Sequence, residues 1–320
     1  MFCDVFDMSG DTGQQSSQPI SRRDFSKLMG GLVAAWAFPG LANAGDLNQA
    51  SLIKEGDIAD AERITLAGAF TKDVEYRVNY LPSECAEYGG KLYQVEPQSI
   101  WWHWDGTATS RIEDHDLVQT TWYGLVGRTK RGDPVAAHFS VGPNTVLQML
   151  PLSASRIIQG RLTDDTSISD IKQAKSLGGV QIETTGRWYD KNPPLECQTA
   201  TLVDLTIAVM KRYRVLFPTI CGHRERAARI PKPDPGVEYL KETRIRLLKT
   251  LIAQAQWPLI GHPDSWNFYM EVLKKGKVIR VPNQTREEIL SRLTEQEKRL
   301  IHTYIVEPSK PAQEHWDNES

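Results

Sequence analysis

Residues 221–236 read CGHRERAARIPKPDPG, and this stretch carries three side chains whose spacing suits a metal site. The imidazole of His223 and the carboxylate of Asp234 are compact zinc ligands, and a short proline-rich loop can fold the second back towards the first. Lys232 then lies beside the metal as a fixed positive charge. Because a catalytic zinc ion needs a third protein ligand and one open position for water, another ligand is expected elsewhere in the chain.

His103 is the best candidate for this third ligand. It lies in SIWWHWDGTA, residues 99–108, where residues 99–102 are predicted to form a buried strand that ends at the histidine. Two histidines and one carboxylate on a scaffold of strands and helices indicate metal-assisted hydrolysis. Two alternatives stay open: Cys221 is a metal ligand instead of a buried strand thiol, and His103 is a histidine buried by its neighbouring tryptophans without a metal role.

The order of the expected elements predicts an α/β fold with a central mixed sheet flanked by helices. The core domain is expected over residues 98–256. The expected strands cover residues 99–102, 135–141, 145–150, 178–183 and 219–221, from apolar runs bounded by turn residues. The expected helices cover residues 57–67, 198–217, 237–256 and 285–304, from apolar residues at helical spacing.

The first 44 residues are typical of an export signal. Residues 21–27, SRRDFSK, precede an apolar stretch and then the small residues Ala42-Asn-Ala44, after which cleavage is expected. The paired arginines resemble the twin-arginine signal, so the protein is expected outside the cytoplasm, in the periplasm or beyond. The apolar stretch is too short to span a bilayer, and no stable membrane anchor is expected.

Three further segments flank the core domain. Residues 45–97 are interpreted as an N-terminal extension, and residues 257–307 as a small helical subdomain at the C-terminus. Thr285-Arg-Glu-Glu288 is typical of a capping box and predicts the start of a charged helix. Residues 308–320 are expected to form a disordered tail.

Charge and cysteine content restrict the partners and the covalent links. The formal net charge of −2 argues against a nucleic-acid partner, because phosphate neutralisation needs clustered Lys and Arg. After removal of the signal, three cysteines remain, and a Cys85–Cys197 disulfide is expected in an oxidising compartment, with Cys221 left as a thiol. Nothing in the sequence indicates an oligomeric state.

Four motifs lie in order along the chain: Ile100-Trp-Trp-His103, the hairpin over residues 137–150, Gly179-Val-Gln-Ile-Glu183, and Gly222-His223 together with Lys232-Pro-Asp234-Pro-Gly236. They resemble motifs of the zinc-dependent N-acetylmuramoyl-L-alanine amidases of the type-2 family, which share a fold with phage lysozyme-amidases and peptidoglycan recognition proteins. Residues 156–160, RIIQG, lack the histidine that many members carry at the corresponding place.

The resemblance implies a central sheet of about six strands and a Zn²⁺ ion held by His103, His223 and Asp234. It implies that Glu183 transfers the proton and that Lys232 stabilises the oxyanion. The implied reaction is hydrolysis of the amide between N-acetylmuramic acid and L-alanine, in peptidoglycan or muropeptides, during cell-wall turnover.

Several alternatives to this interpretation stay open. Gln181 is an alternative occupant of the position assigned to Glu183. The whole chain is alternatively a non-catalytic peptidoglycan-binding protein of the same fold, or a zinc peptidase or amidase that acts on an amide outside the cell wall.

Overall fold

The computed structural model describes residues 66, 70, 73–87, 92–106, 114–153, 155–158, 178–186, 194–226 and 232–308. The expected export signal, nearly all of the helix expected at residues 57–67 and the tail from residue 309 lie outside these ranges. Within them, no helix combines the length and the apolar character that crossing a bilayer requires.

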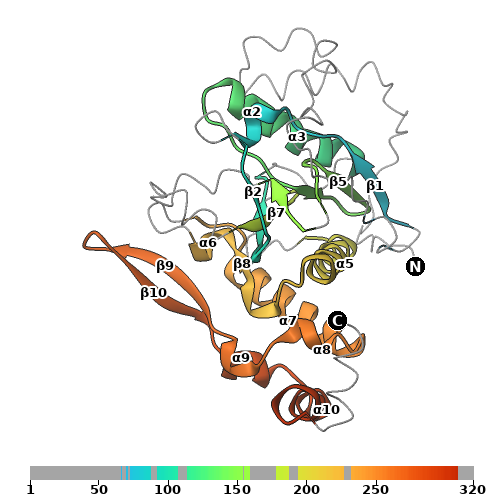
Figure 1. The fold of residues 1–320 in the computed structure, drawn as a ribbon, viewed down its shortest axis with the longest axis vertical. Coiled ribbons are helices and arrows are strands. Elements are labelled where there is room, and N and C mark those ends of the chain that lie inside the picture. Colours follow the sequence, from blue (N-terminus) through green and yellow to red (C-terminus); the bar gives the residue numbers. More distant parts are fainter. Residues whose placement is uncertain are drawn as a thin grey trace, which may run out of the picture. The chain divides into compact units, whose positions relative to one another are not determined.

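In the described part of the chain, a mixed six-stranded sheet has the order β1-β5-β4-β7-β3-β8. Figure 1 labels β1, β5, β7 and β8 of this sheet. Its strands are β1 (Glu75–Val78), β3 (Ser99–Trp104), β4 (Phe139–Val141), β5 (Thr145–Gln148), β7 (Gly179–Thr184) and β8 (Ile220–Gly222). The β4–β5 pair is antiparallel and the other neighbouring pairs are parallel. Strands β2 (Gln94–Val95) and β6 (Ile157–Ile158) form a separate antiparallel pair.

Helices cover both faces of this sheet, so the expected mixed sheet flanked by helices is confirmed. Helices α2 (Ser83–Ala86) and α3 (Asp114–Lys130) pack on one face, where Val118 and Leu125 lie in one apolar cluster with Leu147. Helices α5 (Glu196–Tyr213) and α7 (Val237–Ala253) pack on the other face. The remaining helical segments are α6 (His223–Arg226), α8 (Trp257–Ile260), α9 (Arg286–Ser291), α10 (Glu295–Ile301), η5 (Phe217–Thr219), η6 (Pro263–Ser265) and η7 (His302–Val306).

Side chains alternate along β3 and β7, so one set packs in the apolar core and the other set points to the face of the sheet that carries the candidate site. Ile100 and Trp102 of β3 join the apolar cluster with α5 and α7, as does Ile182 of β7. Because successive side chains of a strand point to opposite faces, His103 and Glu183 lie on the other face of the sheet. The two residues are also direct partners in the β3–β7 register. The sheet therefore brings two of the expected site residues together near the carboxyl ends of parallel strands.

Strand β1 and helix α3 were not expected from the sequence. Strand β1, within the segment interpreted as an N-terminal extension, pairs with β5 and forms one edge of the sheet. Helix α3 was missed because its sequence, DHDLVQTTWYGLVGRTK, contains two glycines and three threonines, which have low helix propensity. Its buried Trp122 and Val126 show that tertiary packing stabilises this helix.

The C-terminal segment contains a β-hairpin as well as the expected helices. Strands β9 (Phe268–Lys274) and β10 (Lys277–Gln284) pair antiparallel. The single helix expected over residues 285–304 is two helices, because each begins at its own threonine N-cap. Thr285 caps α9, whereas Thr294 and Glu297 form the complete capping box of α10.

A buried ion pair connects this hairpin to the sheet. Arg244 of α7 is fully buried, and its guanidinium donates to Glu225 Oε2 at 2.5 Å and to Gln284 Oε1 of β10 at 3.0 Å. The same carboxylate accepts a hydrogen bond from the backbone N–H of Gly222 at 2.9 Å. The pair joins the C-terminal segment to α6, which begins at His223, and removal of one partner would leave an uncompensated buried charge.

The expected Cys85–Cys197 disulfide is wrong for this structure. Neither residue is in a disulfide. Cys85 belongs to α2 and to the apolar cluster of α3, whereas Cys197 lies in the first turn of α5, which covers the opposite face of the sheet. A disulfide requires Cα atoms within about 7 Å, which two residues on opposite faces of one sheet do not meet.

Candidate metal centre

Three buried side chains far apart in the sequence lie close together: His103, His223 and Asp234. The first and the last are 131 positions apart. His103 lies near the end of β3, and His223 is the first residue of α6, directly after β8. Strands β3 and β8 are parallel neighbours, so their carboxyl ends meet at the same edge of the sheet. Asp234 follows in the loop before α7 and completes the group.

The loop that carries Asp234 is folded back onto the residues around His223. The backbone N–H of Arg224 donates to the carbonyl of Asp234 at 2.8 Å. A Cβ atom at Gly222 would lie 2.7 Å from Leu240 Cδ2 and 3.0 Å from Pro235 Cδ. The glycine before His223 leaves room for this close approach of strand, loop and helix, and a larger residue there would have to displace Leu240 and press on Pro235.

The geometry of the three side chains fits a small tetrahedral ion. The two imidazole centroids are 4.6 Å apart, and Asp234 Oδ2 lies 2.8 Å from His223 Nδ1 and 3.7 Å from His103 Nδ1. The possible ligand atoms all lie within 4.8 Å of one another. Two atoms that each bind one zinc ion at about 2 Å are about 3.3 Å apart, so small adjustments suffice. The buried group can therefore hold a metal ion.

The charges of the cluster also favour a cation. Burial raises the pKa of Asp234, but the two histidines act more strongly and hold it well below its usual range, so the carboxylate is ionised. Burial lowers the pKa of His223, with only partial compensation by Asp234, so this ring is neutral near pH 7. Burial also acts on His103, but Asp234 and Glu183 outweigh it and raise its pKa. A proton and a metal ion therefore compete for the same buried anionic site.

Glu183 lies beside the cluster with one carboxylate oxygen inaccessible to solvent. Its Oε2 is buried and has no hydrogen-bond partner among the described residues. Burial raises the pKa of Glu183 to about 8, against the opposing effect of His103 and with a contribution from Asp105. A carboxyl group that titrates near neutral pH is typical of a general acid–base group.

Lys232 lies close enough to the cluster to act on it electrostatically. The pKa of His223 is lowered first by burial, and the positive charge of Lys232 contributes in the same direction. The structure thus brings His103, His223, Asp234 and Glu183 together, with Lys232 two residues before Asp234 on the same loop.

The structure adds Gln181, which sequence reasoning weighed only as a substitute for Glu183. Its Oε1 lies 2.5 Å from Nε2 of His103. The sequence contained an indication of this contact, because residues two apart on a strand point to the same face of the sheet. Gln181 therefore shares a face with Glu183. Cys221, weighed as a ligand, lies instead with Sγ 3.7 Å from the carbonyl of Ile100.

His138 is a packed core histidine whose ring is held neutral. Its Nδ1 accepts from the backbone N–H of Gln181 at 2.9 Å, and its Nε2 donates to the carbonyl of Ile158 at 2.8 Å. Burial lowers the pKa of His138 to about 4. An unfolded histidine binds its proton near pH 6.5, so between pH 6.5 and 4 the unfolded state binds more protons. The free energy of unfolding is therefore expected to fall by about 3 kcal/mol as the pH drops through this range.

Urea denaturation at several pH values tests this expectation. The His138→Asn variant keeps an acceptor for the N–H of Gln181 but has no titrating group at this position. The loss of about 3 kcal/mol in the free energy of unfolding between pH 6.5 and 4 should therefore be absent in this variant. His262→Asn is the matched control, because His262 is half exposed and caps a surface turn. Parallel stability–pH curves for the wild-type protein and His138→Asn would contradict the assignment.

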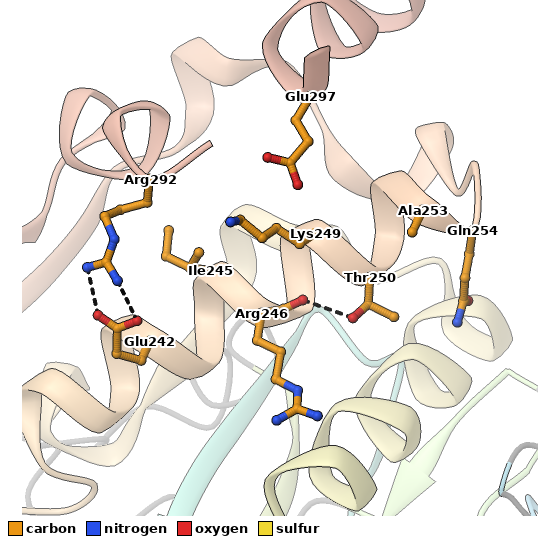
Figure 2. A pocket seen from close by; sticks show the side chains of 9 residues that line it. All are labelled: Glu242, Ile245, Arg246, Lys249, Thr250, Ala253, Gln254, Arg292 and Glu297. Carbon is orange, nitrogen blue, oxygen red and sulfur yellow. Dashed lines mark hydrogen bonds and ion pairs between the residues drawn. The ribbon is translucent and has the colours of Figure 1, made fainter. Parts of the chain in front are cut away.

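A groove on another surface, between α7 and the C-terminal helices, is lined by charged side chains (Figure 2). Arg292 forms an ion pair with Glu242, and Lys249 and Glu297 face the groove from opposite sides. None of the five candidate site residues lines it. Ion pairs of this kind are common where helices meet at a solvent-exposed surface and contribute little to stability.

Comparisons with known proteins find similarity only in structure. No protein-family model and no curated protein matches this sequence. The catalytic domain of XlyA is 13% identical, with 58% of this chain and 97% of that chain covered and a TM-score of 0.36. N-acetylmuramoyl-L-alanine amidase LysC from Clostridium intestinale URNW is 15% identical, with 55% and 97% covered and a TM-score of 0.34. Drosophila peptidoglycan recognition protein SD is 14% identical, with 52% and 90% covered and a TM-score of 0.35.

These identities and TM-scores are too low to transfer a function. What the described residues themselves define is an α/β protein with a buried His-His-Asp group at the carboxyl edge of a mixed sheet, next to a carboxyl group of raised pKa.

Proposed function

We propose that this protein is an exported zinc hydrolase that cleaves the amide between N-acetylmuramic acid and L-alanine in peptidoglycan or muropeptides. The observation that carries the proposal is the convergence of His103, His223 and Asp234 within 4.8 Å, with Glu183 beside them. Two imidazoles and one carboxylate are a common ligand set of catalytic zinc sites, which keep one position open.

Zinc, when bound, supplies a Lewis acid for the scissile carbonyl and activates water at neutral pH. The remaining work falls to the side chains. Glu183 accepts the proton of the attacking water and passes it to the nitrogen of the leaving L-alanine, as a general acid–base carboxyl group beside the ligands can do. The direct β3–β7 pairing of His103 with Glu183 keeps this carboxyl group next to the ligands.

Lys232 supplies the positive charge of the proposed site. Its effect on the pKa of His223 supports a position within electrostatic range of the ligands. A positive charge near the ligands stabilises the negative charge that develops on the carbonyl oxygen during attack. Such stabilisation is strongest where water is excluded. Lys232 is therefore assigned to the oxyanion.

The proposed substrate follows from the four sequence motifs around the site and from the export signal. Residues 1–44 direct the chain to the compartment where peptidoglycan lies. The amide of L-alanine with the lactyl group of muramic acid is the bond that the sequence resemblance implies.

The test combines metal analysis with a digest of purified cell-wall sacculi. We expect about one zinc ion per chain by elemental mass spectrometry and release of stem peptides with a new L-alanine amino terminus. Prior dialysis against a chelator should stop release, and added zinc should restore it. A chain that binds no zinc and releases no peptide would refute the proposal, whereas zinc without release would favour a peptidoglycan-binding protein.

A further inference from the structure

The ring of His103 is held from the side opposite Asp234. Its Nε2 lies 2.5 Å from Oε1 of Gln181, while its Nδ1 is directed towards Asp234 at 3.7 Å. Both His103 and Gln181 are buried, with 6% and 5% of their surface exposed. Because solvent does not compete there, the contact with Gln181 helps to fix the orientation of the ring.

The orientation of the Gln181 amide follows from its other neighbour. Its Nε2 lies 3.5 Å from the carbonyl oxygen of Gly179. The reversed amide would place two acceptor oxygens against each other, so the oxygen must face His103. An amide oxygen only accepts, and His103 therefore carries its proton on Nε2. The lone pair of the neutral ring is then on Nδ1, which faces His223 and Asp234.

The position of Gln181 is itself fixed through its backbone. Its N–H donates to Nδ1 of His138, and its carbonyl accepts from the N–H of His138, both at 2.9 Å. The far nitrogen of the same ring bonds to the carbonyl of Ile158 at 2.8 Å. None of these three bonds uses the side chain of Gln181, so a substitution there changes only the contact with His103 and the weak one with Gly179.

We propose that Gln181 is a positioning residue of the metal centre, which holds His103 in the tautomer that presents Nδ1 to the ion. The inference rests on the proposed function, because it requires that the cluster binds zinc. A hydrogen bond to the second nitrogen of a ligating histidine fixes its tautomer, and loss of such a partner typically weakens metal binding roughly 10- to 100-fold.

The experiment compares Gln181→Met with Gln181→Glu in the full chain, with zinc affinity measured by competition with a chromophoric chelator. Methionine has a similar length but offers no strong acceptor, and we expect a 10- to 100-fold weaker affinity. Glutamate restores the acceptor and should bind zinc at least as tightly as the wild-type protein. Gln198→Met is the matched control, because Gln198 is equally buried but bonds to Val141 and Thr185 instead of a ligand; its affinity should be unchanged.

A second readout needs no metal. Nitrogen-15 NMR of the metal-free protein, at a pH high enough for the His103 ring to be neutral, should show the ring protonated on Nε2, and this preference should be lost in Gln181→Met. Equal zinc affinity of Gln181→Met and wild type, equal weakening in Gln181→Glu, or a neutral His103 ring protonated on Nδ1 instead of Nε2 in the wild-type protein would each overturn the inference. If the proposed function is wrong, the wild-type protein itself takes up no zinc. This result differs from all three outcomes that would overturn the role of Gln181.

Discussion

Replacement of His223 with alanine is expected to abolish zinc binding and peptide release together. The substitution leaves His103 and Asp234, and two protein ligands do not retain zinc at a site that needs three. It also removes the hydrogen bond at 2.8 Å that helps to keep the Asp234 carboxylate ionised. The zinc content should fall from about one ion per chain to near zero, and release of stem peptides from sacculi should fall to the uncatalysed background.

The chain offers a matched control for this variant. Gly261-His-Pro-Asp264 imitates the local sequence around His223, but His262 lies on an exposed turn and pairs with Asp264 at 3.4 Å. His262→Ala should keep full zinc content and activity. If His223→Ala retained both, the assignment of the metal centre would have to be abandoned.

Substitution of Glu183 by glutamine is expected to separate metal binding from turnover. Glutamine keeps the size of the side chain but neither accepts nor delivers a proton at neutral pH. Because Glu183 is not among the three ligands, zinc content should stay near the wild-type value. General acid–base catalysis contributes roughly 10²- to 10⁴-fold, so kcat should fall by that factor while KM changes little.

Steady-state kinetics on a soluble muropeptide, together with zinc analysis of the same preparation, measures this separation. Glu271→Gln serves as the control, since Glu271 is also a largely buried carboxylate but pairs with Arg226 on the hairpin side. Unchanged turnover in Glu183→Gln would show that another group carries the proton. Loss of zinc in this variant would instead place Glu183 among the ligands.

The C-terminal segment illustrates how little a sequence reveals about long-range polar contacts. Glu225 and Arg244 stand in charged stretches that suggest solvated surfaces. In the structure both are buried, and they join the turn at His223 to Gln284 of β10. Residues interpreted as a separate helical subdomain thus share a buried network with the residues next to a proposed metal ligand.

Local sequence patterns predicted the parts of this protein whose cause is local. Strand β7 and helices α5 and α7 follow from the period of their apolar residues, because one buried face imposes that period on the chain. The spacing of His223, Lys232 and Asp234 in one short loop likewise allowed a metal site to be proposed before any contact was known. The helix at 285–304 shows the limit, since the cap at Thr294 divides it.

Only the tertiary structure decided which distant residues meet. The Gln181–His103 contact joins residues 78 positions apart. It exists because β3 and β7 pair in one particular register. A shift of this register by one residue would turn every side chain of β7 to the other face of the sheet. The same register places Glu183 beside His103, and the two faces of the sheet keep Cys85 and Cys197 apart. Strand register and layer packing depend on the whole core at once, so no stretch of sequence specifies them by itself.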